Sequence, residues 1–315
     1  MKDIRVLDGA MGSVLAGLRL REEDFRGRMF PGHGAPLRGN FDVLSLTRPD
    51  LVAAVHRAYL EAGADIIETN TFSANAIAQA RYGLADRVAA LNLAAARLAL
   101  GEARRAEEAT GRPRRVAGAM GPTPVAASAA EFRRVADALG EQAAALIRGG
   151  VDMLLIETLF DVGNARAAVE GIARARAEAG REVPVAFSAT VDPATGRLPS
   201  GDSLEAFVEA TAPAGPVALG LNCCAGPEGL AGPLRRLADA APCAVMAYPS
   251  AGIPDARGRY PASPEDFAAA LAPLVEEGRV CIVGGCCGTT PRHIAELRRL
   301  VDGAGQRATR PPSTR

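Results

Sequence analysis

Two adjacent cysteines, Cys286 and Cys287, stand in the glycine-rich run GGCCGTTP, which covers residues 284–291. A disulfide between neighbouring cysteines strains the peptide that joins them, so both thiols are free to turn toward one ion. The pair Thr290-Pro291 starts a helix, whose positive end lowers the pKa of nearby thiols and favours the thiolates that bind metals. The run therefore predicts two ligands of a metal site, and a tight glycine turn with two buried cysteines is the alternative.

Another part of the chain must supply the third ligand. Cys223 and Cys224 follow Gly-Leu-Asn at the end of a strand-like segment, and either of them can complete a site with three thiolates. The other cysteines and the histidines are expected elsewhere: Cys243 and Cys281 in the core, His56 on a helix surface, and His33 and His293 as structural or solvated residues.

Three protein ligands with an open fourth position are typical of a catalytic zinc site, whereas a structural zinc site is closed. Three thiolates leave the complex negatively charged, which makes the zinc a poor activator of water. Such a zinc can still bind an incoming thiol, lower its pKa and keep it as a nucleophilic thiolate. The cysteines therefore predict alkyl transfer to sulfur.

Acidic residues follow two other strand-like segments. Asp8 and Glu157 together are able to hold the ammonium group of an amino acid, and backbone N–H groups of the turn 9–13, which includes Gly9 and Ala10, face its carboxylate. Capping of the following loops is the alternative role of the two acids. Two further polar residues either join loops or contact substrate: Glu68 and Asn70.

The elements that position these residues are eight short apolar runs, many of them rich in β-branched residues. Segments with helical spacing and helix-start signals separate most of them, which indicates parallel strands with crossover helices. Eight such units predict a single-domain (β/α)8 TIM barrel, with an open doubly wound sheet as the alternative. The predicted strands cover residues 4–7, 65–69, 115–119, 152–158, 184–189, 217–222, 244–248 and 280–284.

In a closed barrel the carboxyl ends of the strands converge on one mouth, where the candidate residues would meet. The long first connection, residues 17–45, is expected to fold over this mouth. The barrel domain is expected to cover residues 1–303, and residues 304–315 are expected to form a flexible, solvated tail.

Charge and composition exclude several classes of protein. The 315 residues carry 36 Lys+Arg and 36 Asp+Glu, so there is no net field to attract nucleic acid or an acidic membrane. Hydrophobic residues make up 48% of the chain, enough for a large core, but no apolar run is long enough to span a membrane or act as a signal peptide. A cytoplasmic protein is expected, in which six cysteines are not paired as disulfides.

The motifs together resemble those of the homocysteine S-methyltransferase family, most closely the homocysteine-binding module of cobalamin-dependent methionine synthase. The resemblance extends over residues 4–303. Its markers are DGAMGS at residues 8–13, DFRG at 24–27, ETNTF at 68–72, GLNC at 220–223 and GGCCGTTP at 284–291.

The resemblance implies a (β/α)8 barrel in which Cys223, Cys286 and Cys287 hold Zn²⁺ and act in catalysis, with the homocysteine thiolate as fourth ligand. It also implies that Asp8 and Glu157 hold the substrate ammonium group. One position departs from the pattern. Methionine synthases commonly have Asn where Ser250 stands, and that Asn can occupy the fourth zinc position without substrate.

The methyl donor is open at this stage. A full methionine synthase continues into folate, cobalamin and reactivation domains, which these 315 residues do not include. The resemblance and the 24–27 motif favour methylcobalamin presented by a separate cobalamin-binding protein. A further alternative is that the chain is one module of a longer protein. A small donor, S-methylmethionine or betaine, is the alternative. A hypothesis from a different functional class is a non-catalytic thiol or zinc sensor that uses the cysteines as a redox switch. The presence of Asp8 together with Glu157 argues against it, because a sensor would not need these acids.

Overall fold

Eight parallel β-strands lie at the centre of the molecule, and all eight were predicted from the sequence. They are β1 (Arg5–Val6), β2 (Ile66–Glu68), β3 (Arg115–Met120), β4 (Met153–Leu159), β5 (Val185–Ala189), β6 (Ala218–Asn222), β7 (Ala244–Tyr248) and β8 (Ile282–Val283). The structure, a computed structural model, describes residues 4–309.

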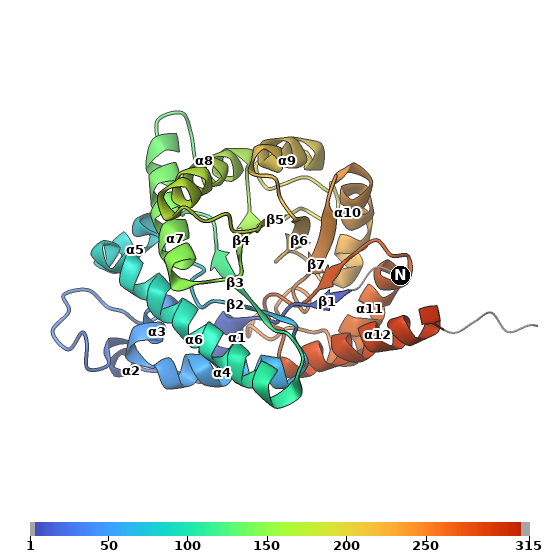
Figure 1. Cartoon of the computed structure of the whole chain (residues 1–315), viewed down its shortest axis with the longest axis horizontal. Coiled ribbons are helices and arrows are strands. Elements are labelled where there is room, and N and C mark those ends of the chain that lie inside the picture. Colours follow the sequence, from blue (N-terminus) through green and yellow to red (C-terminus); the bar gives the residue numbers. More distant parts are fainter. Residues whose placement is uncertain (1–3, 310–315) are drawn as a thin grey trace, which may run out of the picture.

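The strands form one sheet in the order β1-β8-β7-β6-β5-β4-β3-β2. Leu7, which follows β1, pairs with Ile66 of β2, and this contact closes the sheet into a barrel. Figure 1 shows the closed ring of strands surrounded by helices. The predicted (β/α)8 barrel is therefore confirmed.

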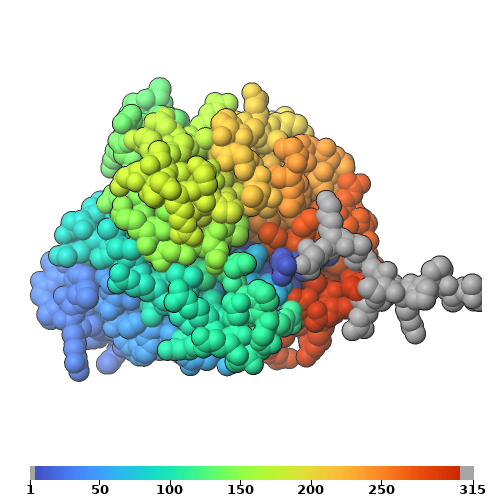
Figure 2. Space-filling view, in the orientation of Figure 1, coloured from blue at the N-terminus to red at the C-terminus, as the bar shows by residue number. Residues whose placement is uncertain are grey.

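Helices follow the strands and cover the outside of the barrel. The α-helices are α1 (Met11–Gly17), α2 (Glu22–Arg26), α3 (Leu44–Thr47), α4 (Pro49–Glu61), α5 (Ala76–Ala80), α6 (Val88–Thr110), α7 (Phe132–Gly149), α8 (Val162–Ala179), α9 (Leu204–Thr211), α10 (Pro227–Ala240), α11 (Pro264–Glu276) and α12 (Pro291–Thr309). Short 3-10 helices are η1 (Phe41–Val43), η2 (Ala85–Arg87) and η3 (Ala212–Ala214). In Figure 2 the sequence colours follow one another around the surface, because successive βα units pack side by side.

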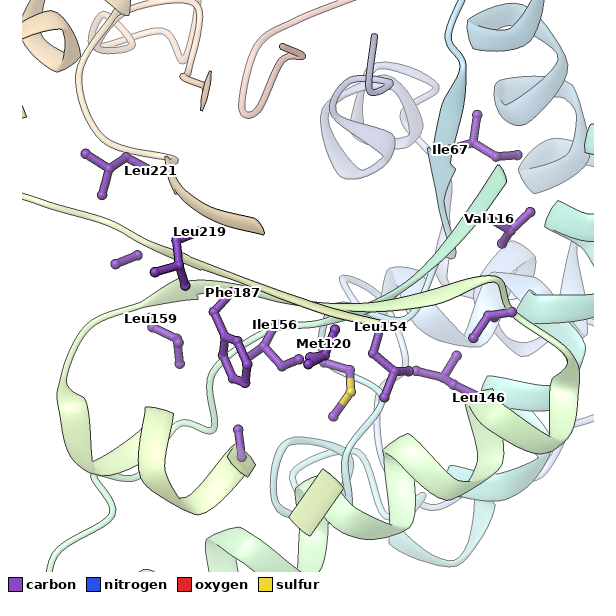
Figure 3. Close-up of a cluster of buried hydrophobic side chains, with 14 of the residues drawn as sticks. Ile67, Val116, Met120, Leu146, Leu154, Ile156, Leu159, Phe187, Leu219 and Leu221 are labelled. Atoms are coloured by element: carbon purple, nitrogen blue, oxygen red, sulfur yellow. The ribbon is translucent and has the colours of Figure 1, made fainter. Parts of the chain in front are cut away.

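Side chains that alternate along the strands build two separate cores. One set fills the barrel interior: Leu7, Ile66, Ala117, Leu155, Ala186, Ala218, Met246 and Tyr248. The other set points outward to the helices, as Figure 3 shows for Leu154, which lies beside Leu146 of α7, and for Ile156 and Phe187. The interior core supports the floor of the mouth, where the candidate residues lie.

The long first connection, residues 17–45, is held together by its own polar groups. Arg26 donates to the carbonyls of residues 33 and 35, and Glu22 accepts the N–H groups of residues 37 and 38. Phe25 is buried in the core. Residues 39–42 then line a cavity at the mouth, as the prediction of a covering loop requires.

Two expectations need correction. His56 is completely buried, not on a helix surface, because α4 packs against α1, α3 and α6. The last helix continues to Thr309, and Ala304 is 1% exposed, so the tail does not begin at residue 304. Residues 310–315 of the expected tail lie outside the described part of the chain.

Among residues 4–309, no helix combines the length and apolar character that crossing a bilayer requires.

Candidate metal centre and substrate pocket

Three cysteines meet at the mouth of the barrel. Cys223 directly follows β6, and Cys286 and Cys287 lie in the connection between β8 and α12. Their sulfur atoms all lie within 4.8 Å of one another, and the Sγ atoms of Cys223 and Cys287 are 3.4 Å apart. Three sulfurs at this separation can hold one metal ion, and zinc accepts such a donor set. Within the described residues, Cys224, Cys243 and Cys281 are free cysteines outside this cluster.

Hydrogen bonds among the three thiols separate their pKa values. Contacts from Cys223 and Cys286 lower the pKa of Cys287 to about 3. Contacts with Cys223 and Cys287, together with burial, raise the pKa of Cys286. The contact with Cys286 lowers the pKa of Cys223. The contact with Cys287 and burial outweigh this effect and raise the pKa of Cys223 to about 12. The cluster therefore concentrates negative charge on Cys287, where a cation would be stabilised.

Backbone contacts fix the loop that carries the cysteine pair. The Cys286 N–H donates to the Pro249 carbonyl at 2.8 Å, and the Ala251 N–H donates to the Cys287 carbonyl at 2.9 Å. Gly288 has a φ of 80°, and a Cβ there would collide with the ring of Tyr260. Glycine is therefore required at this position of the turn. The loop after β7 thus holds the cysteine loop in place.

Three carboxyl groups lie beside the sulfur cluster, those of Asp8, Glu68 and Glu157. Burial raises the pKa of Glu68 to about 7. The pKa values of Asp8 and Glu157 are raised well above their usual range, mainly by burial and secondly by the nearby charge of Glu68. The Asp8 Oδ1 and Glu68 Oε1 atoms are buried without a hydrogen-bond partner among the described residues. Such a group of acids favours a cation such as an ammonium group.

Asn222, the last residue of β6, connects the acids to the sulfur cluster. Its side-chain nitrogen donates to Glu157 Oε2 at 3.3 Å and lies 3.7 Å from Cys286 Sγ. The residues that follow Glu157 and Asn222, Thr158 and Cys223, have φ angles of 59° and 51°. This left-handed backbone costs a non-glycine residue about 1–2 kcal/mol. Strain of this kind is concentrated at functional sites.

A cavity of about 450 Å³ opens over these groups at the mouth. Its inner wall includes the three cysteines together with Glu68 and Glu157, and the backbone of Gly9 and Ala10 forms another side. Asp8 lies behind this wall, where its Oδ2 atom accepts the Glu68 N–H at 3.0 Å. Of the three acids, only Glu68 and Glu157 belong to the cavity lining.

The outer part of the cavity has a different character. Phe72 and Phe160 line it and are 41% and 42% exposed. Arg81 also lines it, with its guanidinium 5.1 Å from the centre of the Tyr82 ring and no salt bridge within the described chain. Aromatic faces and a cation occur together here, so this part suits a ligand with a cationic methyl group and a carboxylate.

The structure brings together most of the residues that the sequence singled out. Cys223, Cys286 and Cys287 share one cluster, and Glu157 lies beside them. Asn70 donates to the Phe41 carbonyl and to Ser45 and also lines the cavity, so both roles that the sequence left open stay predictions. Asn222 and Arg81 were not predicted as site residues, although Asn222 directly precedes Cys223 in the sequence.

The fold and the site define a class of protein. It is a (β/α)8 barrel in which three cysteines that could hold a metal ion lie beside an acidic pocket. The profile of the family described as homocysteine S-methyltransferase matches residues 5–301 of the chain. The chain belongs to this family and is a methyltransferase.

Solved structures similar to this chain include two forms of the homocysteine methyltransferase MmuM from Escherichia coli. The metallated form is 24% identical, with a TM-score of 0.72, and the oxidized form is 26% identical, with a TM-score of 0.70. Each comparison covers 95% of this chain and 96% of the other. The two barrels therefore share one fold over almost their whole length.

Proposed function

We propose that this enzyme is a zinc-dependent homocysteine S-methyltransferase that produces methionine. The observation that carries the proposal is the position of three sulfurs within 4.8 Å of one another beside three acids that form no salt bridge with any residue of the described chain. A thiol amino acid has two groups that match these two features. Its sulfur suits a thiolate-bound metal, and its ammonium group suits the acids.

Cys223, Cys286 and Cys287 would hold the zinc ion, because their sulfurs converge and no other group of three such ligands occurs in the described residues. When bound, zinc supplies a Lewis acid that lowers the pKa of the substrate thiol and keeps it as a nucleophilic thiolate. Ser250, the departure noted in the sequence, is buried and does not line the cavity. Ser250 is therefore badly placed to occupy the fourth metal position in the absence of substrate and to be displaced by the substrate thiol.

The acids would orient the amino-acid end of homocysteine. Glu157 and Glu68 lie at the cavity wall and would contact the ammonium group, while Asp8 adds negative charge from behind. The backbone of Gly9 and Ala10 would face the carboxylate. With its sulfur at the cysteine cluster and its amino-acid end at the acids, homocysteine would be held in one orientation, with the outer part of the cavity left for the methyl donor.

The reaction is a direct displacement at the methyl carbon. A lone pair of the homocysteine sulfur forms the new S–CH₃ bond, and the bond between the methyl group and its carrier breaks with its electron pair left on the carrier. The thiol proton of homocysteine leaves to solvent before this step. No external oxidant or reductant is needed, and the methyl configuration inverts.

Two kinds of methyl donor fit the reaction, a protein-bound corrinoid and a small molecule. The sequence resemblance favours methylcobalamin presented by a separate protein. Two residues of its marker DFRG, however, form bonds within this chain: Arg26 donates to the His33 carbonyl, and Asp24 accepts from Arg48. The outer cavity favours a small donor, S-methylmethionine or betaine, because Arg81, Phe72 and Phe160 match a carboxylate and a cationic methyl group.

The test is to incubate the zinc-loaded protein with homocysteine and one donor at a time, and to measure methionine by mass spectrometry. We expect methionine with at least one donor, and its loss together with bound zinc in Cys286→Ala. Turnover without any corrinoid would exclude a requirement for methylcobalamin. Absence of methionine with every donor, or full activity of Cys286→Ala, would contradict the proposed function.

The same zinc-loaded protein also distinguishes the proposed enzyme from a non-catalytic thiol or zinc sensor. X-ray absorption at the zinc edge reports how many sulfurs surround the ion. The proposed enzyme adds a fourth sulfur when homocysteine is present, whereas a sensor need not do so.

A further inference from the structure

Asn222 occupies a position between the sulfur cluster and the acids where every polar atom of its side chain has a partner. It is completely buried at the carboxyl end of β6. Its carbonyl oxygen accepts the Thr158 N–H at 3.0 Å and the Ser188 hydroxyl at 2.7 Å. A backbone N–H can only donate, so the atom that faces it must be the amide oxygen. The orientation of the amide is thereby determined.

The amide nitrogen consequently points in the opposite direction, toward three acceptors. These are Thr158 Oγ1 at 2.8 Å, Glu157 Oε2 at 3.3 Å and Cys286 Sγ at 3.7 Å. An amide NH₂ group has two hydrogens, so the acceptors share them. One side chain on a buried strand therefore contacts both a proposed metal ligand and the carboxyl group proposed to bind the substrate ammonium.

We propose that Asn222 is a specificity-determining residue that fixes the separation between the sulfur cluster and the Glu157 carboxyl, and so selects a thiol amino acid of the length of homocysteine. The inference rests on the proposed function, because it assigns the two ends of the substrate to these two groups. Asn222 is a positioning residue: it contacts the groups that hold the substrate and is absent from the cavity lining.

The physical basis is the difference of one methylene between homocysteine and cysteine. With the sulfur and ammonium sites at a fixed separation, cysteine cannot reach both at once. A displacement of 1 Å at a reacting centre costs about 10²-fold in rate. One methylene in a specific site is worth about 10–200-fold. A rigid amide that holds both sites can therefore account for discrimination of this size.

The variant Asn222→Asp tests the proposal. The Asp side chain keeps an oxygen for the Thr158 N–H and the Ser188 hydroxyl, but replaces the NH₂ group with an oxygen that repels the Glu157 carboxylate. We expect the ratio of kcat/KM for homocysteine to that for cysteine to fall at least about tenfold. Ser188→Ala is the matched control, since it removes a contact on the carbonyl side only and should leave the ratio unchanged.

A second readout does not depend on turnover. Zinc-edge X-ray absorption of the zinc-loaded wild-type protein should show an added sulfur with homocysteine and none with cysteine, and Asn222→Asp should lose this distinction. If Asn222→Asp does not fold, Asn222→Ser replaces it, because a Ser hydroxyl is too short to contact Glu157 and Cys286 together.

The outcomes separate this inference from the proposed function. If the wild-type protein does not methylate homocysteine, the proposed function fails. If the wild-type protein does so, and a folded Asn222 variant that binds zinc keeps the homocysteine-to-cysteine ratio within about twofold, the role of Asn222 is refuted while the proposed function stands.

Discussion

The Sγ atoms of Cys223 and Cys287 lie 3.4 Å apart, although 64 residues separate them in the chain. Cys223 follows β6 and Cys287 follows β8, and both strands pair with β7 between them. Parallel register brings the carboxyl ends of all three strands to the same mouth. The closed sheet therefore assembles the cluster, and neither cysteine needs a partner within its own segment.

This arrangement predicts a pattern of protection against alkylation. Zinc should slow the reaction of Cys223, Cys286 and Cys287 with iodoacetamide at least about tenfold, and a chelator should restore it, because a metal occupies the sulfur lone pairs. Peptide mass spectrometry gives the rate at each cysteine. The half-buried Cys243 is the internal control and should react equally under both conditions. Equal rates with and without zinc at the three cysteines would be inconsistent with the metal site.

Removing the charge of Glu157 should weaken homocysteine binding selectively. Glu157→Gln keeps the size of the side chain but loses the charge-assisted bond to the ammonium group, worth about 1.5–3 kcal/mol. We expect the KM for homocysteine to rise about 10- to 100-fold with unchanged zinc content. Glu141→Gln, a change of the same kind on α7 outside the cavity, should have no effect. An unchanged KM in Glu157→Gln would remove this carboxyl from substrate binding.

The donor hypotheses differ in what they require of Arg81. For a small donor with a carboxylate, Arg81→Gln should raise the KM of the donor about tenfold and leave the KM for homocysteine unchanged, because only the donor reaches the outer cavity. Arg38→Gln is the control, since Arg38 is exposed but does not line the cavity. With methylcobalamin as donor, the Arg81 substitution should have no such effect.

The strands were predictable from local sequence, and the cysteine cluster followed from the predicted barrel, although only the family resemblance chose Cys223 over Cys224. β-Branched apolar runs mark buried parallel strands, and barrel closure then decides which strand ends meet. The relative positions of the acids were not predictable. Asp8 follows β1 and Glu68 ends the neighbouring strand β2, yet only Glu68 lines the cavity. The stagger of a barrel is a property of the whole sheet, which no local pattern encodes.

The burial of His56 escaped prediction for a related reason. The pattern of α4 indicates one apolar face, which fits a helix with an exposed opposite side. In the structure several helices contact α4, including α1, α3 and α6, and the face with His56 is covered. Both ring nitrogens have no hydrogen-bond partner in the described part of the chain. Packing between helices that are distant in sequence thus decides the environment of this residue.

His56 should make the protein less stable in mild acid. Burial lowers its pKa from 6.5 to about 4, so below pH 6.5 the unfolded chain binds a proton that the folded chain does not. Stability is therefore lost as the pH falls from about 6.5 to about 4, and linkage gives a loss of about 2 kcal/mol between pH 8 and pH 5. His56→Leu, which cannot be protonated, should lose about 2 kcal/mol less over this interval. Urea unfolding at both pH values, with EDTA present to remove metal effects, measures the difference. Equal losses in the two proteins would show that His56 does not remain neutral in the folded state.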